Sequence, residues 1–320
     1  MGERRVIVDT DTAGDDSQAL VLAALSDRVE LEAVTVVAGN VDFEYEVENA
    51  KYALDLCDAA DVPVYEGVRE PLQKSYDTAE YVHGEGGLGG DLFPDTGIES
   101  ADGHAVDRIV AAARENPGEV TLVAIGPLTN VALACLREPD LDELLESVWV
   151  MGGAVNTVGN VTPAAEYNFW VDPDAADVVT DHLDVHLVDW GLTVRDSTFE
   201  TDTLARIADA AEESRFAAFY DEITTSVRAF NEEAMGRDCT TQPDSLAMAC
   251  LLAPDVVEET GRYHLDVDER EGPTRGYSLV DEGGVLEEPA NATVVKSVDA
   301  DAFRDLFLDA VVHGEPHRRH

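Results

Sequence analysis

The chain has 320 residues, of which 45% are hydrophobic and 28% charged, and its 67 acidic residues against 21 Lys and Arg give a formal net charge of −46. So acidic a surface repels phosphates, which excludes nucleic acid as an expected partner. No apolar run approaches the roughly 20 residues of a membrane span, and the amino-terminal run 6–8 is too short for the core of a secretory signal. We therefore expect a cytoplasmic protein with no membrane partner.

The acidic excess also favours a halophilic origin. A surface of this charge repels itself, and the repulsion is tolerable when salt shortens the screening length to about 3 Å, as at about 1 M. The alternative is an ordinary acidic protein. The dependence of the melting temperature on KCl distinguishes the two.

Short β-branched runs alternate with amphipathic stretches along the first 190 residues, which is typical of βαβ units. In chain order we expect strands at 6–8, 31–38, 121–125, 147–151 and 185–188, with helices at 17–25 and 44–60. This order predicts an α/β fold with a mostly parallel, Rossmann-like central sheet flanked by helices. We found no linker or repeat, so one domain over residues 1–320 is expected.

The last hundred residues change in character. A long helix is expected at 214–235, a shorter one at 244–252, strands at 263–267, 277–280 and 293–295, and a final helix from Ala300. These strands predict a small carboxy-terminal strand region. The four cysteines are widely spaced and expected to be reduced; Cys239 lies in a polar segment, which favours exposure of its thiol.

Carboxylates crowd the turn after the first expected strand, which reads Asp9-Thr10-Asp11-Thr12-Ala13-Gly14-Asp15-Asp16. Like charges so close repel unless a cation neutralises them, and oxygen ligands suit a hard ion such as calcium or magnesium. A helix cap explains one aspartate at a helix start but not four. The pattern therefore predicts a metal site at the end of the first strand.

Two other aspartate motifs were compared with this turn. An EF-hand loop starting at Asp9 fails, because Ala13 fills a ligand position and Leu20 replaces the closing glutamate. A haloacid-dehalogenase-type phosphohydrolase also begins with a DxD motif, but it needs a later lysine, and Lys51, Lys74 and Lys296 do not follow strands convincingly. That enzyme and a non-catalytic nucleoside- or ribose-binding protein remain the alternative functions.

The turn resembles the signature of the inosine-uridine preferring nucleoside hydrolase family, and the resemblance covers most of the chain. Further segments similar to the family follow in the family's order: Val36-Val37-Ala38-Gly39-Asn40, His83-Gly84-Glu85-Gly86-Gly87, Ile125-Gly126-Pro127-Leu128-Thr129-Asn130, Val150-Met151-Gly152-Gly153, Ala165-Glu166-Tyr167-Asn168-Phe169 and Pro243-Asp244-Ser245-Leu246-Ala247. Each segment alone is modest evidence. Their common order makes coincidence an unlikely explanation.

The resemblance implies a set of site residues. Calcium would be held by Asp11, Asp16, Asp244 and the main-chain carbonyl of Ile125, with Asp11 also acting as the base for a metal-bound water. The ribose would be held by Asp15, Asn40, Glu166 and Asn168, with Asn160 near the sugar and Asp9 supporting the turn. It also implies a homodimer or homotetramer.

The implied reaction is hydrolysis of the N-glycosidic bond of a ribonucleoside to ribose and free nucleobase. Breaking this bond builds positive charge on the sugar, so carboxylates around the ring stabilise the transition state. Simpler roles remain open for the supporting residues: Asn40 and Asn168 as turn residues, Glu166 as a surface acid, His83 as a loop histidine and Trp190 as a core residue.

The sequence departs from the family at two places. The usual Pro-Gly after the second aspartate is Thr12-Ala13, so a turn that demands a positive φ at position 13 would strain Ala13. Pro243 stands where purine-active members have a histidine that helps to protonate the leaving base. The remaining candidates for this role are His83, Asp238 and Cys239, and the preferred nucleobase stays open.

Overall fold

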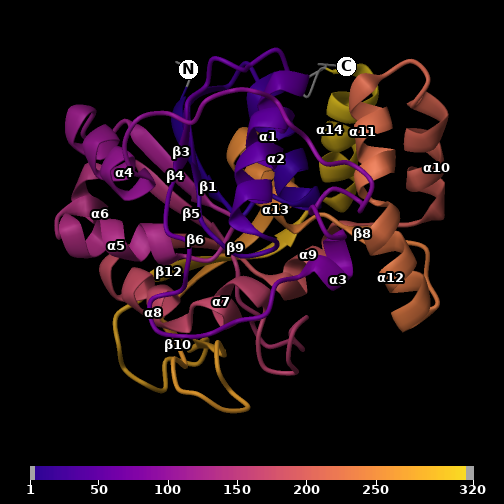
Figure 1. The fold of residues 1–320 in the computed structure, drawn as a ribbon. Coiled ribbons are helices and arrows are strands. Elements are labelled where there is room, and N and C mark those ends of the chain that lie inside the picture. Colours follow the sequence, from indigo (N-terminus) through magenta and orange to yellow (C-terminus); the bar gives the residue numbers. More distant parts are fainter. Residues whose placement is uncertain (1–3, 315–320) are drawn as a thin grey trace.

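An eight-stranded sheet forms the centre of residues 4–314, which is the part of the chain that the computed structural model describes (Figure 1). Its strands follow one another in the order β3 (Val64–Glu66), β2 (Val29–Val36), β1 (Arg4–Thr10), β4 (Val120–Ala124), β5 (Ser147–Met151), β6 (Val185–Val188), β12 (Ala292–Val298) and β9 (Val257–Tyr263). Neighbouring strands run parallel, except β12 and β9, which are antiparallel. The expected α/β fold with a mostly parallel sheet is confirmed.

Both faces of the sheet are covered by helices, so its strands are apolar on both sides. On β1, Val6 and Val8 pack into one core and Ile7 into the other. The first core takes helices α1 (Gly14–Leu25), α2 (Phe43–Leu56), α10 (Thr201–Ala210), α11 (Arg215–Ile223), α13 (Pro243–Leu252) and α14 (Ala300–His313). The second takes α4 (Ala105–Glu115), α5 (Thr129–Arg137), α6 (Leu141–Leu144) and α8 (Pro173–His182).

The remaining elements are not part of the central sheet or of the helices assigned above to the two cores. They are α3 (Glu80–His83), α7 (Tyr167–Val171), α9 (Trp190–Asp196), α12 (Thr225–Met235), a 3-10 turn (Pro254–Val256), and two antiparallel pairs: β7 (Thr198–Phe199) with β8 (Thr240–Thr241), and β10 (Leu265–Val267) with β11 (Ser278–Val280). The β10–β11 pair is the small carboxy-terminal strand region that we expected.

Two predicted elements of the carboxy-terminal part are wrong in their continuity. The single helix expected at 214–235 is divided into α11 and α12 at Thr224, whose hydroxyl donates to the carbonyl of Tyr220 at 2.8 Å, a local bond that competes with the helical ladder. The strand expected at 263–267 is two strands. Asn291 bonds both the N–H and the carbonyl of Leu265, at 2.7 and 2.9 Å, as the chain leaves β9 for the β10–β11 pair.

All four cysteines are buried free thiols, which corrects the expectation for Cys239. Its segment is polar in sequence, but Asn231 donates to the carbonyl of Cys239 at 2.9 Å and holds the segment against α12. Among residues 4–314, no helix is long and apolar enough to cross a membrane.

The strand order reverses direction at β1, which has β2 on one side and β4 on the other. Asp9 pairs with Thr35 of β2 and with Ala124 of β4, so the residues that follow these three strands emerge at one edge of the sheet. In open parallel sheets, ligands bind in the crevice at this switch point. The fold therefore places the aspartate turn where a ligand site is expected.

Candidate active site

The turn after β1 is formed without backbone strain. Ala13 is extended, with φ −120° and ψ −150°, and α1 begins at Gly14, so no residue of the turn needs a left-handed conformation. The Asp16 carboxylate closes the turn: it accepts from the N–H of Ala13 at 3.1 Å and from the hydroxyl of Thr10 at 2.6 Å. The replacement of the family's Pro-Gly by Thr12-Ala13 is thus accommodated at this position.

Asp11 is buried between the ends of two other strands. A Cβ atom on Gly39 would lie 2.1 Å from one Asp11 carboxylate oxygen, and a Cβ atom on Gly126 would lie 2.7 Å from the other. Only glycine leaves room for the carboxylate at these two places. Burial, reinforced by the neighbouring charges of Asp16 and Glu46, holds the pKa of Asp11 well above its usual range.

Three further carboxylates converge beside Asp11. Oxygens of Asp15, Asp16 and Asp244 lie within 4.8 Å of one another. Asp244 comes from the first turn of α13, and burial together with the charges of Asp15 and Asp16 raises its pKa well above the usual range. A group of buried acids in this arrangement is stable as anions only beside a cation.

The donor set fits a hard metal ion. Both carboxylate oxygens of Asp11 are buried, and neither has a hydrogen-bond partner among the described residues. Unpaired buried acceptors are costly, and a cation with oxygen ligands removes that cost. Asp15, which we expected at the ribose, contributes an oxygen to the group of three carboxylates. Asp11, which we expected as a metal ligand, is not in that group but supplies two unpartnered carboxylate oxygens beside it.

The carbonyl of Ile125, the fourth expected metal ligand, faces Asn168. The Asn168 side chain donates to this carbonyl at 2.9 Å and to the carbonyl of Met151 at 3.2 Å, which links the ends of β4 and β5. Asn168 is therefore more than a local turn residue. It fixes the sheet edge at which the carboxylates gather.

Glu166 is buried, so the interpretation of this residue as a surface acid is wrong. Its carboxylate caps α7, accepting from the N–H groups of Asn168 at 2.8 Å and Phe169 at 3.3 Å, and it also accepts from Gly153 at 2.8 Å. Burial nevertheless dominates and raises the pKa of Glu166 to about 7.

A cavity of about 430 Å³ is lined by Asp15, Glu166, Asn168 and Asp244. The remaining expected site residues Asn40, His83, Asn160 and Trp190 line it as well. Asn40 donates to the carbonyl of Asp11 and to the Asp16 carboxylate, each at 3.2 Å. His83 ends α3, with its Nδ1 3.9 Å from an Asp15 oxygen, and burial lowers the pKa of His83. Trp190 both packs against the core and faces the cavity.

Asp9 lies within β1 itself, before the aspartate turn, and is fully buried. Its carboxylate accepts from the Thr35 hydroxyl at 2.6 Å and from the Asn130 amide at 2.8 Å, which ties β1 to β2 and to the start of α5. Burial raises the pKa of Asp9 to about 7. The supporting role of Asp9 in the turn stays a prediction, since its side-chain bonds run to β2 and α5.

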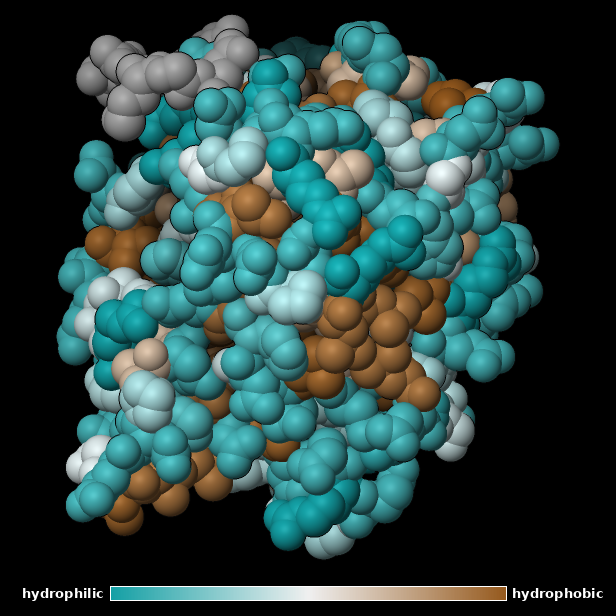
Figure 2. All heavy atoms as spheres, turned by 90° about the vertical axis from the view of Figure 1, so that its left-hand side faces the viewer, coloured by the Kyte–Doolittle hydropathy of each residue, from teal (hydrophilic) through white to brown (hydrophobic). Residues whose placement is uncertain are grey.

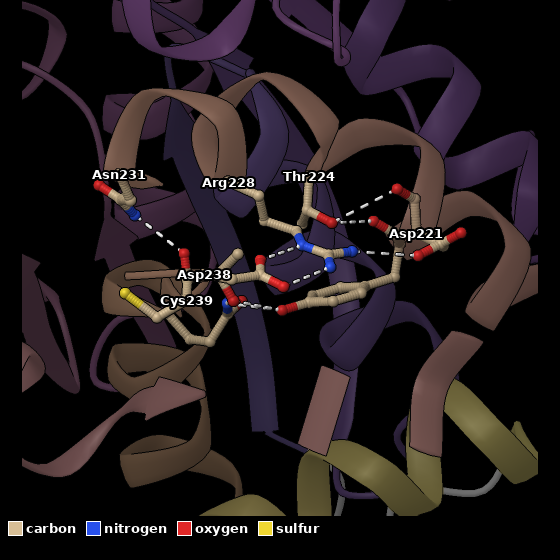
Figure 3. Close-up of polar contacts among 9 residues, drawn as sticks. Asp221, Thr224, Arg228, Asn231, Asp238 and Cys239 are labelled. Atoms are coloured by element: carbon tan, nitrogen blue, oxygen red, sulfur yellow. Dashed lines mark hydrogen bonds and ion pairs between the residues drawn. The ribbon is translucent and has the colours of Figure 1, made fainter. Parts of the chain in front are cut away.

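Of the two other candidates for protonating a leaving base, Asp238 is held in a two-point ion pair with Arg228, at 2.7 and 2.8 Å (Figure 3). Arg228 lowers the pKa of Asp238, so this acid is ionised at neutral pH and has no proton to give. Burial raises the pKa of the Cys239 thiol, which lines the cavity in its neutral form.

Sequence reasoning missed two supporting residues of α2. Glu46 accepts from the N–H groups of Gly39 and Val41, at 2.9 and 3.1 Å, and so holds the loop that carries Asn40. Asn49 donates to the carbonyls of Thr12 and Gly86, both at 2.9 Å, and joins the aspartate turn to the loop after His83. Their sequence signal is a pair of polar residues three apart on the buried side of an amphipathic helix.

Comparison with known proteins gives one consistent result. The model of the inosine-uridine preferring nucleoside hydrolase family matches residues 6–305. A pyrimidine-specific ribonucleoside hydrolase of Escherichia coli is 33% identical over 314 residues, covering 97% of this chain and 98% of that protein. Two solved structures are similarly close: a plant nucleoside hydrolase (TM-score 0.89, 28% identity, 97% and 99% of the two chains) and a purine-preferring ribonucleoside hydrolase from Gardnerella vaginalis (TM-score 0.88, 28% identity, 97% and 98%).

Proposed function

The chain belongs to the inosine-uridine preferring nucleoside hydrolase family, whose members are enzymes acting on N-glycosyl compounds, and we propose that it is a calcium-dependent ribonucleoside hydrolase that uses Asp11 as its base. The observation that carries this proposal is the buried Asp11 carboxylate, with two unpartnered oxygens beside Asp15, Asp16 and Asp244. A nucleoside hydrolase is also favoured over the phosphohydrolase alternative, because the phosphohydrolase needs a lysine at its site. The chain's three lysines lie in ion pairs with Glu48, Asp174 and Glu282.

Calcium would be held by Asp11, Asp16, Asp244 and the carbonyl of Ile125, where it would neutralise the carboxylates and polarise the attacking water. Asp11 would accept the proton of that water, since both of its carboxylate oxygens are buried without a hydrogen-bond partner among the described residues. Substitution of Asp11 is therefore the most direct test of the base.

The ribose would lie against Asp15, Asn40, Asn160, Glu166 and Asn168, which line the cavity. A ribose diol needs acceptors and donors, and carboxylates and amides supply both. As the bond to the base breaks, positive charge builds on the sugar, and the surrounding carboxylates stabilise it more in the transition state than in the ground state. His83 is proposed to assist the leaving base by donating a hydrogen bond from the N–H of its neutral ring, since burial lowers the pKa of His83 and the ring lies beside Asp15.

The test is an assay of reducing sugar released from uridine, cytidine, inosine and adenosine at high KCl. We expect ribose release that a chelator abolishes and added calcium restores. Absence of ribose from every nucleoside would reject the enzyme activity, and a rate indifferent to chelation would reject the calcium. The variant His83→Ala is run alongside, and unchanged rates would remove His83 from the mechanism.

Two further properties belong to the proposal. We expect a homodimer or homotetramer, as the family resemblance implies, and a cytoplasmic enzyme of a halophilic cell, as the charge of −46 favours. Sedimentation at high KCl tests the assembly, since a single species at the monomer mass of 34.5 kDa would contradict it.

A further inference from the structure

Three buried polar side chains form a closed hydrogen-bonded ring in the wall of the cavity. Tyr220 comes from α11, Thr240 from β8, and Gln242 precedes α13. The two hydroxyl oxygens lie 2.7 Å apart, and the Gln242 amide nitrogen donates to each of them at 2.9 Å. All three residues line the cavity, as do Asp244 and His83.

Counting hydrogens in this ring leaves one donor unused. The amide gives one hydrogen to each hydroxyl oxygen, and the contact between the two oxygens consumes one of the two hydroxyl hydrogens. The other hydroxyl hydrogen has no acceptor among the described residues, and the side-chain carbonyl oxygen of Gln242 has no donor there. Burial raises the pKa of Tyr220, so its phenol keeps its hydrogen at neutral pH.

The ring is fixed in place by its surroundings (Figure 3). The Arg228 ion pair with Asp238 and the bond from Asn231 to the Cys239 carbonyl hold the segment before Thr240 against α12. The N–H of Gln242 donates to the carbonyl of Ser197 at 3.2 Å on the other side. A donor held this firmly is suited to recognition, because little conformational freedom is lost when a ligand binds.

The chain needs such a donor at this place. Pro243, directly before Asp244, has neither a side-chain donor nor an N–H. When the bond between sugar and base breaks, both electrons of the bond leave with the base nitrogen. A hydrogen-bond donor at an acceptor atom of the base stabilises this growing negative charge without transferring its proton.

On the basis of the proposed hydrolase function, we propose that Tyr220, Thr240 and Gln242 form the nucleobase-recognition site. The unused hydroxyl hydrogen donates to a carbonyl oxygen or ring nitrogen of the leaving base, and the Gln242 carbonyl accepts from an adjacent N–H. The substrate class is a nucleoside whose base presents an acceptor next to an N–H donor.

The hydrogen count gives an unusual expectation for mutants. In Tyr220→Phe the hydroxyl hydrogen of Thr240 has no partner within the ring, and in Thr240→Val the same holds for the hydroxyl hydrogen of Tyr220. Each single variant therefore retains one hydroxyl donor. Only the double variant has no hydroxyl donor, and the donors left in the ring are the two Gln242 N–H hydrogens, which lose both of their acceptors. We expect each single variant to lose less than about threefold in kcat/KM for the best nucleoside, so that the product of the single losses stays below about tenfold. The double variant should lose about 10- to 100-fold, more than that product.

The matched substrate is 4-nitrophenyl β-D-ribofuranoside, whose leaving group is stable as an anion and has no base edge to recognise. We expect all three variants to hydrolyse it within about twofold of the wild type, which also shows that they fold. Tyr263→Phe, which removes a hydroxyl from the sheet edge, is the control for loss of a tyrosine hydroxyl.

Two results would overturn the recognition site: a double variant no worse than the product of the single losses, or a parallel loss on the nitrophenyl riboside. If the wild type hydrolyses neither substrate, the result rejects the proposed hydrolase function, and the recognition site is rejected together with it. These outcomes are distinguishable in one set of assays.

Discussion

Asp11 combines features that a structural aspartate does not need. It is buried, its two oxygens have no hydrogen-bond partner among the described residues, and two glycines leave room for its carboxylate. We expect Asp11→Asn to lower kcat by at least about 1000-fold with a much smaller change in KM, because the base acts in the transition state. The control is Asp27→Asn, which removes the same charge from an exposed position. A kcat within tenfold of the wild type would remove Asp11 from the mechanism.

Glu166 makes the stability of the ligand-free protein depend on pH. Its pKa is raised from 4.5 to about 7 by burial, so between these values the folded protein holds a proton that the unfolded chain has lost. The stabilisation is therefore complete below about pH 4.5 and is lost as the pH rises through about 7. We expect the free energy of unfolding to fall between pH 5 and pH 8, and to fall less in Glu166→Gln.

Chemical denaturation at constant ionic strength measures this difference. Glu258→Gln removes the same charge from an exposed position on β9 and should keep the wild-type slope. Equal slopes for Glu166→Gln and the wild type would show that Glu166 does not retain its proton in the folded state.

At the scale of elements, the site depends on how closely the strand ends approach one another. A methyl group on Gly39, at the end of β2, would meet an Asp11 oxygen at 2.1 Å, so Gly39→Ala must displace the carboxylate or the loop. Displacements of about 1 Å cost roughly 100-fold in rate. We expect Gly39→Ala to lose at least that much in kcat/KM and to bind calcium more weakly, measured by calorimetry.

The control for this change is Gly283→Ala, since the nearest atom to an added Cβ there is a Val285 methyl at 3.4 Å. It should retain activity and calcium affinity. Wild-type calcium binding by Gly39→Ala would mean that Asp11 does not depend on this close approach.

The same scale explains how much the sequence could predict. The strands at 147–151 and 185–188 were predicted with the bounds of β5 and β6, because a buried parallel strand is a short, mostly apolar run rich in β-branched residues. The aspartate turn was found from its charges alone. The break at Thr224 was missed because the sequence around it continues a helical pattern, and the side-chain bond of Thr224 to the Tyr220 carbonyl leaves no signal of its own in that pattern.

Parts of the site formed by distant segments escaped prediction for a related reason. Glu46, Asn49 and the ring of Tyr220, Thr240 and Gln242 lie in segments that show no motif of their own. Their partners are far along the chain or belong to the backbone. Only tertiary packing brings Tyr220, Thr240 and Gln242 to the cavity wall and places Glu46 and Asn49 against the loops beside the site.

At the scale of the whole molecule, the dominant property is a net charge of −46. Hydrophilic residues cover most of the face in Figure 2, although several hydrophobic areas interrupt them, the largest of them right of the centre. Acidic side chains with few cations among them repel one another, and the compact state suffers more than the extended chain because its charges are closer together. Salt near 1 M shortens the screening length to about 3 Å and removes most of this repulsion.

We therefore expect the melting temperature to rise steadily with KCl from about 0.1 M to about 2 M, together with the rate of ribose release. Salt can also stabilise by exclusion from the protein surface, so sucrose at matched osmolality is the control, because it is excluded but screens no charge. Stabilisation by KCl well beyond that by sucrose would identify charge repulsion as the cause. Equal stability and activity in dilute buffer would contradict the halophilic origin and leave an ordinary acidic hydrolase, with the aspartate site unaffected because its charges are buried.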